Sequence, residues 1–189
     1  MKIKIHPLFF VFWVIFALIG DTEFILYIFI AAAFHEAAHI CAFTSYGAEL
    51  DSIQLLPFGI SATVKNAAVL SCKKEIICAA AGPITNLVLT AVTMLPKDII
   101  SGADTLAYCS FALFLINIMP SLPLDGGRIL WFALLTFLPY KKAKKISDCT
   151  NIITTAALLT IGVVFAVQSG NISVLMIGGY LVIYIVFKS

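Results

Sequence analysis

Long apolar runs, separated by short polar connections, constrain this chain more than any other feature of its sequence. Hydrophobic residues make up 61% of its 189 residues and charged residues only 12%, whereas a soluble domain is about half apolar and about a quarter charged. A helix needs about 20 consecutive apolar residues to cross a bilayer. We therefore predict an integral membrane protein, whose length allows about six crossings joined by short connections.

Most of these apolar runs are long enough to be read directly as crossings, and the first is shorter. The first run ends at Asp21 and Glu23 and lacks a small-residue cleavage site, so it is predicted to be a retained span rather than a signal peptide. Gly82 and Pro83 lie inside the third run and predict an interruption of its helix. The runs cover residues 7–20, 24–46, 75–96, 150–167 and 171–187.

A further apolar region, residues 105–138, decides the topology because prolines, glycines and an aspartate lie in its middle. Lysines concentrate on the cytoplasmic side of membrane proteins. If the region crosses once, both termini are cytoplasmic and every lysine except Lys97 faces the cytoplasm, whereas two crossings would move the cluster at residues 140–145 to the other side. We predict one crossing with a non-helical middle, which a membrane tolerates only where the break is buried in protein or lines a watery cavity.

Residues 47–74 differ from the apolar runs because they mix polar and β-branched residues. Pro57, Phe58 and Gly59 form a turn signal within this segment. The pattern predicts a strand pair or hairpin at the membrane surface. The expected fold class is an all-α polytopic membrane protein with about six transmembrane helices, a broken fourth helix and a small membrane-surface β-hairpin, in a single domain over residues 1–189.

The second run contains the pattern HExxH, formed by His35, Glu36 and His39. Residues four apart share one helix face at about 5–6 Å between Cβ atoms, so both imidazoles can bind one Zn²⁺ at about 2.0–2.1 Å. Glu36 is offset by one residue and can reach a metal-bound water without binding the ion. In a soluble surface helix the same pattern is often two solvated histidines, but ionisable side chains within a membrane are functional by default. We predict a metal site.

A catalytic zinc typically has three protein ligands and one water position, so a third ligand must come from another segment. Asp125, in SLPLDGGR, is the main candidate, because the surrounding prolines and glycines prevent a regular helix and let the backbone bend around a site. The alternatives for Asp125 are an ion pair with Arg128 or capping of a helix over residues 128–138. His6 is a weaker candidate, since it lies at the mouth of the first span and reads as an interfacial histidine.

Two asparagines in the apolar runs also need an explanation. Asn117 lies eight residues before Asp125 and can donate a hydrogen bond to the carbonyl oxygen that becomes negative during peptide hydrolysis, or satisfy backbone groups freed by the break. Asn86, in AGPITN, is expected to tie helices together by hydrogen bonds. The five cysteines show no ligand spacing and are predicted to be structural.

Three motifs together resemble the site-2 protease family of intramembrane zinc metalloproteases: HEAAH, AAGPITNL and NIMPSLPLDGGR. KIHP, QLLPFG and the spacing N-x7-D are similar to its sporulation-type branch, the stage IV F-B proteases. The resemblance implies that His35, His39 and Asp125 bind one Zn²⁺ per chain, that Glu36 is the catalytic acid and base, and that Asn117 assists. It also implies release of a membrane-tethered sigma factor during sporulation. Many members of that branch carry a C-terminal cystathionine-β-synthase-type domain, which is not expected within residues 1–189.

The expected activity is cleavage of a peptide bond in or next to the membrane segment of a tethered protein. Glu36 would take a proton from the zinc-activated water and later protonate the leaving amine. The substrate must be extended, so we expect residues 47–64 or the 117–124 loop to pair with its backbone by strand addition. The predicted substrate-binding residues are Gln54, Leu55, Leu56, Pro57, Phe58, Gly59 and Pro123.

Two other functions fit part of the pattern. A divalent-metal transporter would also place histidines and acids in the membrane, but it needs further ligands along a path, and the sequence has one cluster. A non-catalytic regulatory homologue would most simply lack Glu36. The expected environment is a bacterial-type cytoplasmic membrane, with the site between its middle and the cytoplasmic side. The expected partners are lipid, the protein substrate and inhibitory or regulatory membrane proteins, without nucleic acid.

Overall fold

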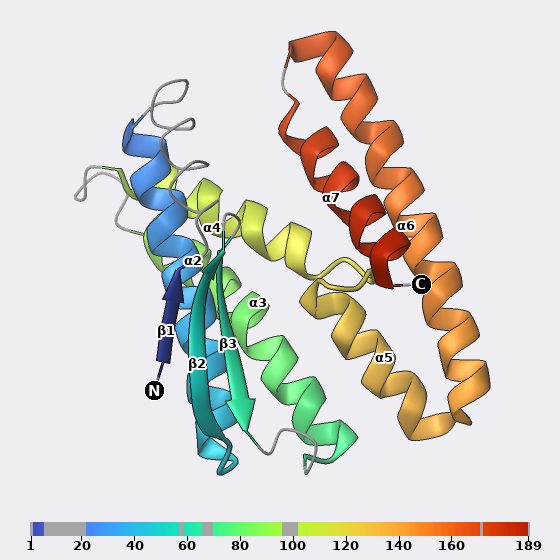
Figure 1. Cartoon of the computed structure of the whole chain (residues 1–189). Helices are drawn as coiled ribbons and strands as arrows, with labels where there is room; N and C mark the ends of the chain where they lie inside the picture. The colour runs from blue at the N-terminus through green and yellow to red at the C-terminus, as the bar shows by residue number, and fades with distance from the viewer. Residues whose placement is uncertain are drawn as a thin grey trace. The chain divides into compact units, whose positions relative to one another are not determined.

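The computed structural model describes residues 2–5, 22–56, 59–65, 70–95, 102–170 and 172–188. The first apolar run and His6 lie outside these residues, as do Pro57 and Phe58 of the turn signal. The chain divides into two compact units, residues 1–116 and 117–189, which are described separately. Figure 1 labels the six helices and three strands of the described residues.

Two long helices form the frame of the first unit. They are α2 (Thr22–Ser45) and α3 (Cys72–Met94), and they pack against each other. Gly47 ends α2 with a φ of +81°, a left-handed conformation that glycine adopts at no steric cost. The amides of Gly47 and Ala48 donate to the carbonyls of Thr44 and Phe43 at 2.9 and 3.1 Å, which is the Schellman pattern of a helix end.

The helix α3 runs without interruption through Gly82 and Pro83, so the predicted break there is wrong. Proline lacks an N–H, so Pro83 cannot donate the helical hydrogen bond to the carbonyl four residues earlier. Membrane helices tolerate such a proline because neighbouring groups satisfy the freed carbonyl. The shorter helix α4 (Ala103–Asn117) follows. The Thr90 hydroxyl of α3 donates to the Ala107 carbonyl of α4 at 3.5 Å.

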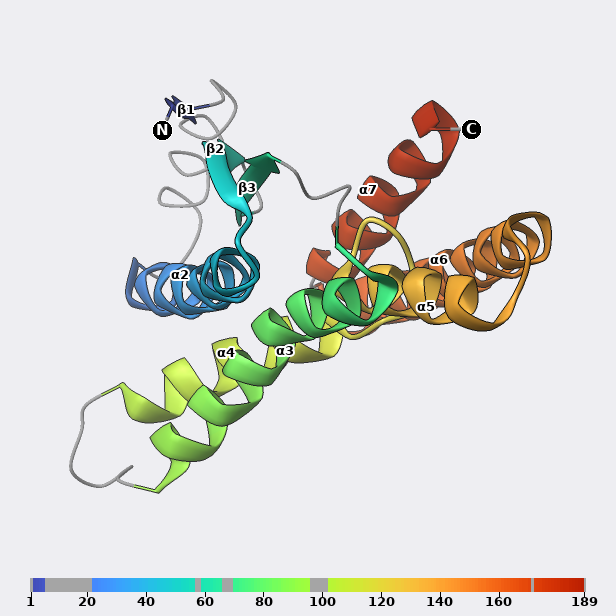
Figure 2. The same ribbon diagram turned by 90° about the horizontal axis from the view of Figure 1, so that it is seen from below.

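Three strands of the first unit form one sheet with the order β1-β2-β3. They are β1 (Lys2–Ile5), β2 (Glu49–Leu56) and β3 (Gly59–Lys65). The central strand β2 pairs in parallel with β1 and antiparallel with β3, with an irregularity between Leu50 and Ser52. In Figures 1 and 2 the strands lie beside α2, which contacts β2 and β3. The strand β1 was not predicted, because four residues give too short a pattern.

The second unit contains three helices, α5 (Asp125–Phe137), α6 (Tyr140–Ser169) and α7 (Ser173–Lys188). The predicted non-helical middle of residues 105–138 is present, since residues 118–124 separate the end of α4 from the start of α5. The helix α6 begins about ten residues before the predicted run, at the lysine cluster. Lysines are good helix formers, and Lys144 pairs with Asp148 one turn later at 2.9 Å.

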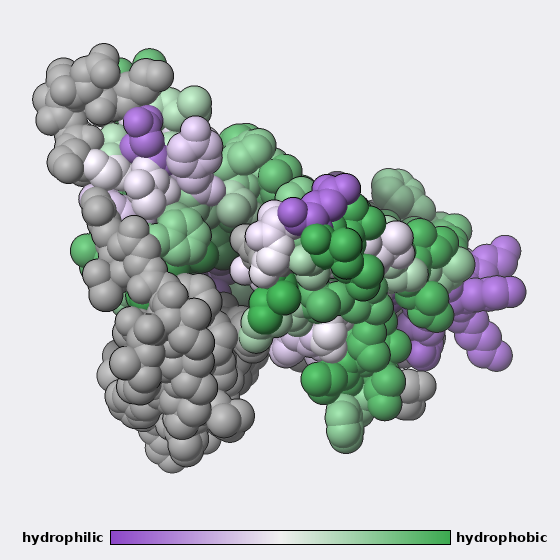
Figure 3. Space-filling view, turned by 90° about the horizontal axis from the view of Figure 1, so that it is seen from above, coloured by the Kyte–Doolittle hydropathy of each residue, from purple (hydrophilic) through white to green (hydrophobic). Residues whose placement is uncertain are grey.

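Three described helices, α2, α3 and α6, are long and apolar enough to cross a membrane, and α4 and α7 are shorter apolar helices. Hydrophobic residues cover much of the visible surface of the described helices in Figure 3. Exposed aliphatic and aromatic side chains of this kind are expensive in water and favourable in lipid. The chain is therefore an integral membrane protein.

Candidate metal centre

The two histidines of HExxH lie on the buried face of α2. Their side chains are only 5% and 7% exposed, at His35 and His39 respectively. Their Nε2 atoms are 3.1 Å apart, and the rings meet edge to face. Two nitrogens bound to one tetrahedral ion at about 2.0–2.1 Å would be about 3.3 Å apart. The helical spacing therefore brings the two imidazoles to a separation that suits a shared metal ion.

The helix α3 holds both rings from their Nδ1 side. His39 Nδ1 donates to the Cys78 carbonyl at 2.7 Å, which fixes the proton on that nitrogen and leaves the lone pair on Nε2. His35 Nδ1 lies 3.0 Å from the Asn86 side-chain nitrogen. Metal-binding histidines almost always donate the N–H of the other ring nitrogen to an acceptor, as His39 does here. The expectation that Asn86 ties helices together is confirmed by its contact with His35.

Gly82 lies between these two contacts and lets the backbone of α3 approach both imidazoles closely. A Cβ at this position would be 2.6 Å from His35 Nε2 and closer still to His39 Nε2. No side chain larger than hydrogen fits there while the rings keep their positions. Because Cys78, Gly82 and Asn86 are four residues apart, they share one face of α3. This close packing of α3 holds the two imidazoles in the pairing that the structure shows.

Glu36 is half-buried on α2, next to His35 in the chain. Its offset from the histidine pair is the one that the sequence predicts for a group acting beside the metal.

Asp125 is the first residue of α5 and is 8% exposed. Capping of that helix by Asp125 is a wrong prediction, because the N-cap is Leu124 and makes no side-chain cap hydrogen bond. The helix starts three residues earlier than predicted, which places Asp125 inside its first turn. The predicted ion pair with Arg128 is present, with Arg128 Nη1 3.9 Å from Asp125 Oδ1.

The segment before Asp125 is held by α6 and by two glycines. The Leu122 amide donates to Asn151 Oδ1 of α6 at 2.8 Å. A Cβ on Gly126 would be 2.5 Å from the Met119 carbonyl oxygen, and one on Gly127 would be 2.6 Å from that of Ser121. The glycines therefore let α5 begin directly against the irregular backbone. The role of Asn151 was missed, because nothing in the sequence links it to a segment 29 residues away.

The other residues predicted for the site lie in α4, in the segment before α5 and in the sheet. Asn117 is the half-buried last residue of α4, and Pro123 is half-buried in the segment before α5. Gln54 and Leu55 lie in β2, where each is paired on both sides: Gln54 with Lys4 and Ser61, Leu55 with Ile5 and Ile60. Leu56 pairs with Gly59, which begins β3.

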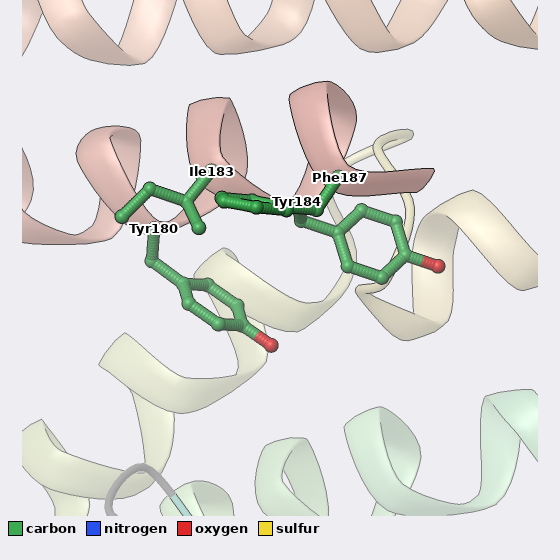
Figure 4. A pocket seen from close by; sticks show the side chains of 4 residues that line it. All are labelled: Tyr180, Ile183, Tyr184 and Phe187. Carbon is green, nitrogen blue, oxygen red and sulfur yellow. The ribbon is translucent and has the colours of Figure 1, made fainter. Parts of the chain in front are cut away.

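A shallow pocket lies on α7. Its lining is Tyr180, Ile183, Tyr184 and Phe187, all from one helix face (Figure 4). None of these side chains is a carboxylate or an imidazole, so the pocket offers no hydrolytic or metal chemistry.

A histidine pair inside an apolar helix, with the Nδ1 atom of each ring in contact with a second helix, is typical of a membrane metalloprotein. Known proteins with similar sequences are metalloproteases and a sporulation protein. The chain is 26% identical to stage IV sporulation protein FB of Bacillus subtilis, over 80% of this chain and 54% of that protein. It is 28% identical to the zinc metalloprotease MJ0392 of Methanocaldococcus jannaschii, over 94% of this chain and 54% of that protein. The chain thus spans about half the length of these curated relatives.

The fold agrees with these relatives. The solved structure of the site-2 protease from Methanocaldococcus jannaschii matches with a TM-score of 0.69 and 25% identity, covering 95% of this chain and 86% of that one. No family model matches the chain. The chain is thus similar in sequence and in fold to members of the site-2 protease family, and its similarity to the sporulation protein agrees with the sporulation-type branch.

Proposed function

We propose that this protein is an intramembrane zinc metalloendopeptidase acting in regulated intramembrane proteolysis. The observation that carries the proposal is the pair of imidazoles inside an apolar helix, with Nε2 atoms 3.1 Å apart and the backbone of α3 packed against both rings at Gly82. Ionisable side chains at the centre of a membrane helix cost about 2.5–3.5 kcal/mol each on insertion scales. A functional role explains their presence where a structural one does not.

Zinc would be held by His35 and His39 through Nε2 and by Asp125 through a carboxylate oxygen. Imidazole and carboxylate are ligand types found in catalytic zinc sites. When bound, zinc would supply a Lewis acid and a more acidic water. The nearly complete burial of these three side chains supports a role away from bulk water.

Glu36 would accept a proton from the attacking water and return it to the leaving amine nitrogen. Its half-buried place next to His35 supports this role. Asn117 would donate a hydrogen bond to the carbonyl oxygen as that oxygen becomes negative. Its position at the end of a helix, where the backbone becomes irregular, supports a side chain directed at a site rather than at lipid.

The proposed topology has six crossings, in which α4, residues 118–124 and α5 form one broken crossing. Both termini would be cytoplasmic, the three-stranded sheet would lie at the membrane surface, and the site would lie between the membrane centre and the cytoplasm. The lysine-rich start of α6 supports this orientation.

The substrate would be a membrane-tethered protein whose backbone adds to the sheet as an extended strand. The order of the strands decides which edge of the sheet can receive the substrate strand. Since Gln54 and Leu55 are paired on both sides, the edge proposed here is β3, which among the described residues pairs only with β2. The relative from Bacillus subtilis is named as a sporulation protein, and a membrane-tethered pro-sigma factor is the proposed substrate on that basis.

One reconstitution tests the activity against the alternatives. The wild type and Glu36→Gln are placed in vesicles with a single-span substrate and loaded with zinc. A protease cleaves the substrate only with the wild type, while both proteins bind one zinc. Metal flux through both proteins would instead indicate a transporter, and equal cleavage or equal inactivity of the two would refute the role of Glu36.

Replacing residues 54–59 by a Gly/Ser run tests the sheet. Zinc binding should persist and cleavage should stop, because the sheet would no longer present an ordered edge. Cleavage at the wild-type rate would remove strand addition from the proposal.

A further inference from the structure

The side chain of Asn86 is completely buried in the middle of α3, at 0% exposure. Its amide nitrogen lies 3.0 Å from His35 Nδ1, whereas its amide oxygen has no hydrogen-bond partner in the structure. A buried carbonyl oxygen without a partner is unfavourable. The arrangement therefore calls for an explanation of what the oxygen does.

The two ends of an asparagine amide differ only in whether they donate or accept. Rotation of the amide by 180° places Oδ1 where Nδ2 lies, within hydrogen-bond distance of the same histidine nitrogen. In that orientation the oxygen accepts a hydrogen bond from a protonated His35 Nδ1, and the amide nitrogen takes the place that Oδ1 holds in the structure. The proton then resides on Nδ1, so the lone pair of His35 resides on Nε2.

The same arrangement already exists at the other histidine. The Cys78 carbonyl accepts from His39 Nδ1 at 2.7 Å. Cys78 and Asn86 lie two turns apart on one face of α3, on either side of Gly82. With both contacts in the accepting sense, α3 holds both Nδ1 protons, and both lone pairs reside on the Nε2 atoms, which are 3.1 Å apart.

We propose that Asn86 is a positioning residue, whose amide oxygen fixes the tautomer and the orientation of His35 for metal binding. This inference rests on the proposed function only in that His35 and His39 bind the metal. A second-helix acceptor of this type typically changes metal affinity by about 10–100-fold when it is removed.

Three substitutions in the full-length protein separate an accepting role from simple packing. Asn86→Asp keeps an acceptor at the same position, and Asn86→Leu keeps the approximate volume without any hydrogen bond. Thr90→Val is the matched control, because Thr90 is buried one turn further along α3 and its hydroxyl donates to the Asn86 main-chain carbonyl. Zinc affinity is measured by competition with a chelator, and the ligand field by the visible absorption of the Co²⁺-loaded protein.

We expect Asn86→Leu to bind zinc about 10–100-fold more weakly and to change the Co²⁺ spectrum. Asn86→Asp should remain within a few-fold of the wild type, and Thr90→Val should be unchanged. Wild-type affinity in Asn86→Leu would overturn the proposal, as would equal weakening in Asn86→Asp or in Thr90→Val. Failure of the wild type to bind zinc would refute the proposed function itself, so the two failures are distinct.

A measurement on the unchanged protein covers the case in which Asn86→Leu does not fold. The chain has three histidines, so a ¹⁵N-histidine spectrum of the zinc-loaded wild type is simple to assign. A proton on His35 Nδ1 is expected. An unprotonated Nδ1 in the zinc-loaded protein would overturn the proposal.

Discussion

Replacing Gly82 by alanine places a methyl group against both imidazoles of the HExxH pair. The new Cβ would lie 2.6 Å from His35 Nε2 and closer to His39 Nε2, whereas ordinary contact starts at 3.4 Å. Either the rings or the helices must therefore move by roughly 1 Å. Zinc–nitrogen bonds tolerate deviations of only about 0.2 Å, so at least one imidazole should lose its bond.

The magnitude follows from that lost bond. We expect zinc to bind at least about 100-fold more weakly, which is about 2.8 kcal/mol at about 1.4 kcal/mol per factor of ten. Stability should fall modestly, because inserting a methyl group into a packed site costs about 1–3 kcal/mol and the preference for alanine over glycine in a helix interior offsets only about 0.8–1.0 kcal/mol of it. Gly82→Ala should bind zinc poorly and cleave no substrate. Chelator competition and thermal unfolding of the metal-free protein measure the two effects.

Gly179→Ala is the matched control, since Gly179 lies within α7 and a Cβ there has nothing within 4 Å. It should show the gain in helix propensity without any change in zinc affinity. If Gly82→Ala binds zinc within about threefold of the wild type while remaining folded, Gly82 does not border the metal, and the proposed use of the two Nε2 atoms is wrong.

Two further predictions concern the second unit. Asp125→Asn should weaken zinc binding at least about tenfold, because a neutral amide is a poorer zinc ligand than a carboxylate; chelator competition measures it, and unchanged affinity would exclude Asp125 as a ligand. Asn151→Leu should lower the free energy of unfolding by about 1 kcal/mol, because the partly buried Leu122 amide loses its acceptor. Thermal unfolding checks the second prediction against Thr160→Val, an exposed position whose hydroxyl bonds only within its own helix and which should change stability little.

Sequence patterns predicted those helices whose length and ends are determined by residues within the helix or next to it. The run containing HEAAH was predicted over 24–46 and is observed as α2, Thr22–Ser45, because apolar length and a glycine stop are local signals. The prediction at Pro83 was wrong, since the effect of a buried proline depends on what surrounds it. The strand β1 gave no usable signal, because a four-residue strand is defined by its partner β2 rather than by its own pattern.

The site was predictable only in part for the same reason. Helical spacing alone brings His35 and His39 together, and the separation of their Nε2 atoms agrees with it. The contributions of Cys78 and Gly82 were not predictable, because one is a main-chain carbonyl and the other is the absence of a side chain. Both depend on the register between α2 and α3, which no pattern within either helix specifies.

The turn at the end of α2 helps to set that register. It brings Phe43 and Ala48 together, and these two residues form a buried cluster with Cys78 of α3. The Cys78 side chain is thus packed by the end of α2, while its carbonyl accepts the His39 Nδ1 proton one turn before that end. Because one residue makes both contacts, packing at the helix end and orientation of the imidazole are coupled. A shift of α3 by one residue along α2 would break the cluster and the hydrogen bond together, so the apolar contacts outside the site hold the histidines in their metal-binding geometry.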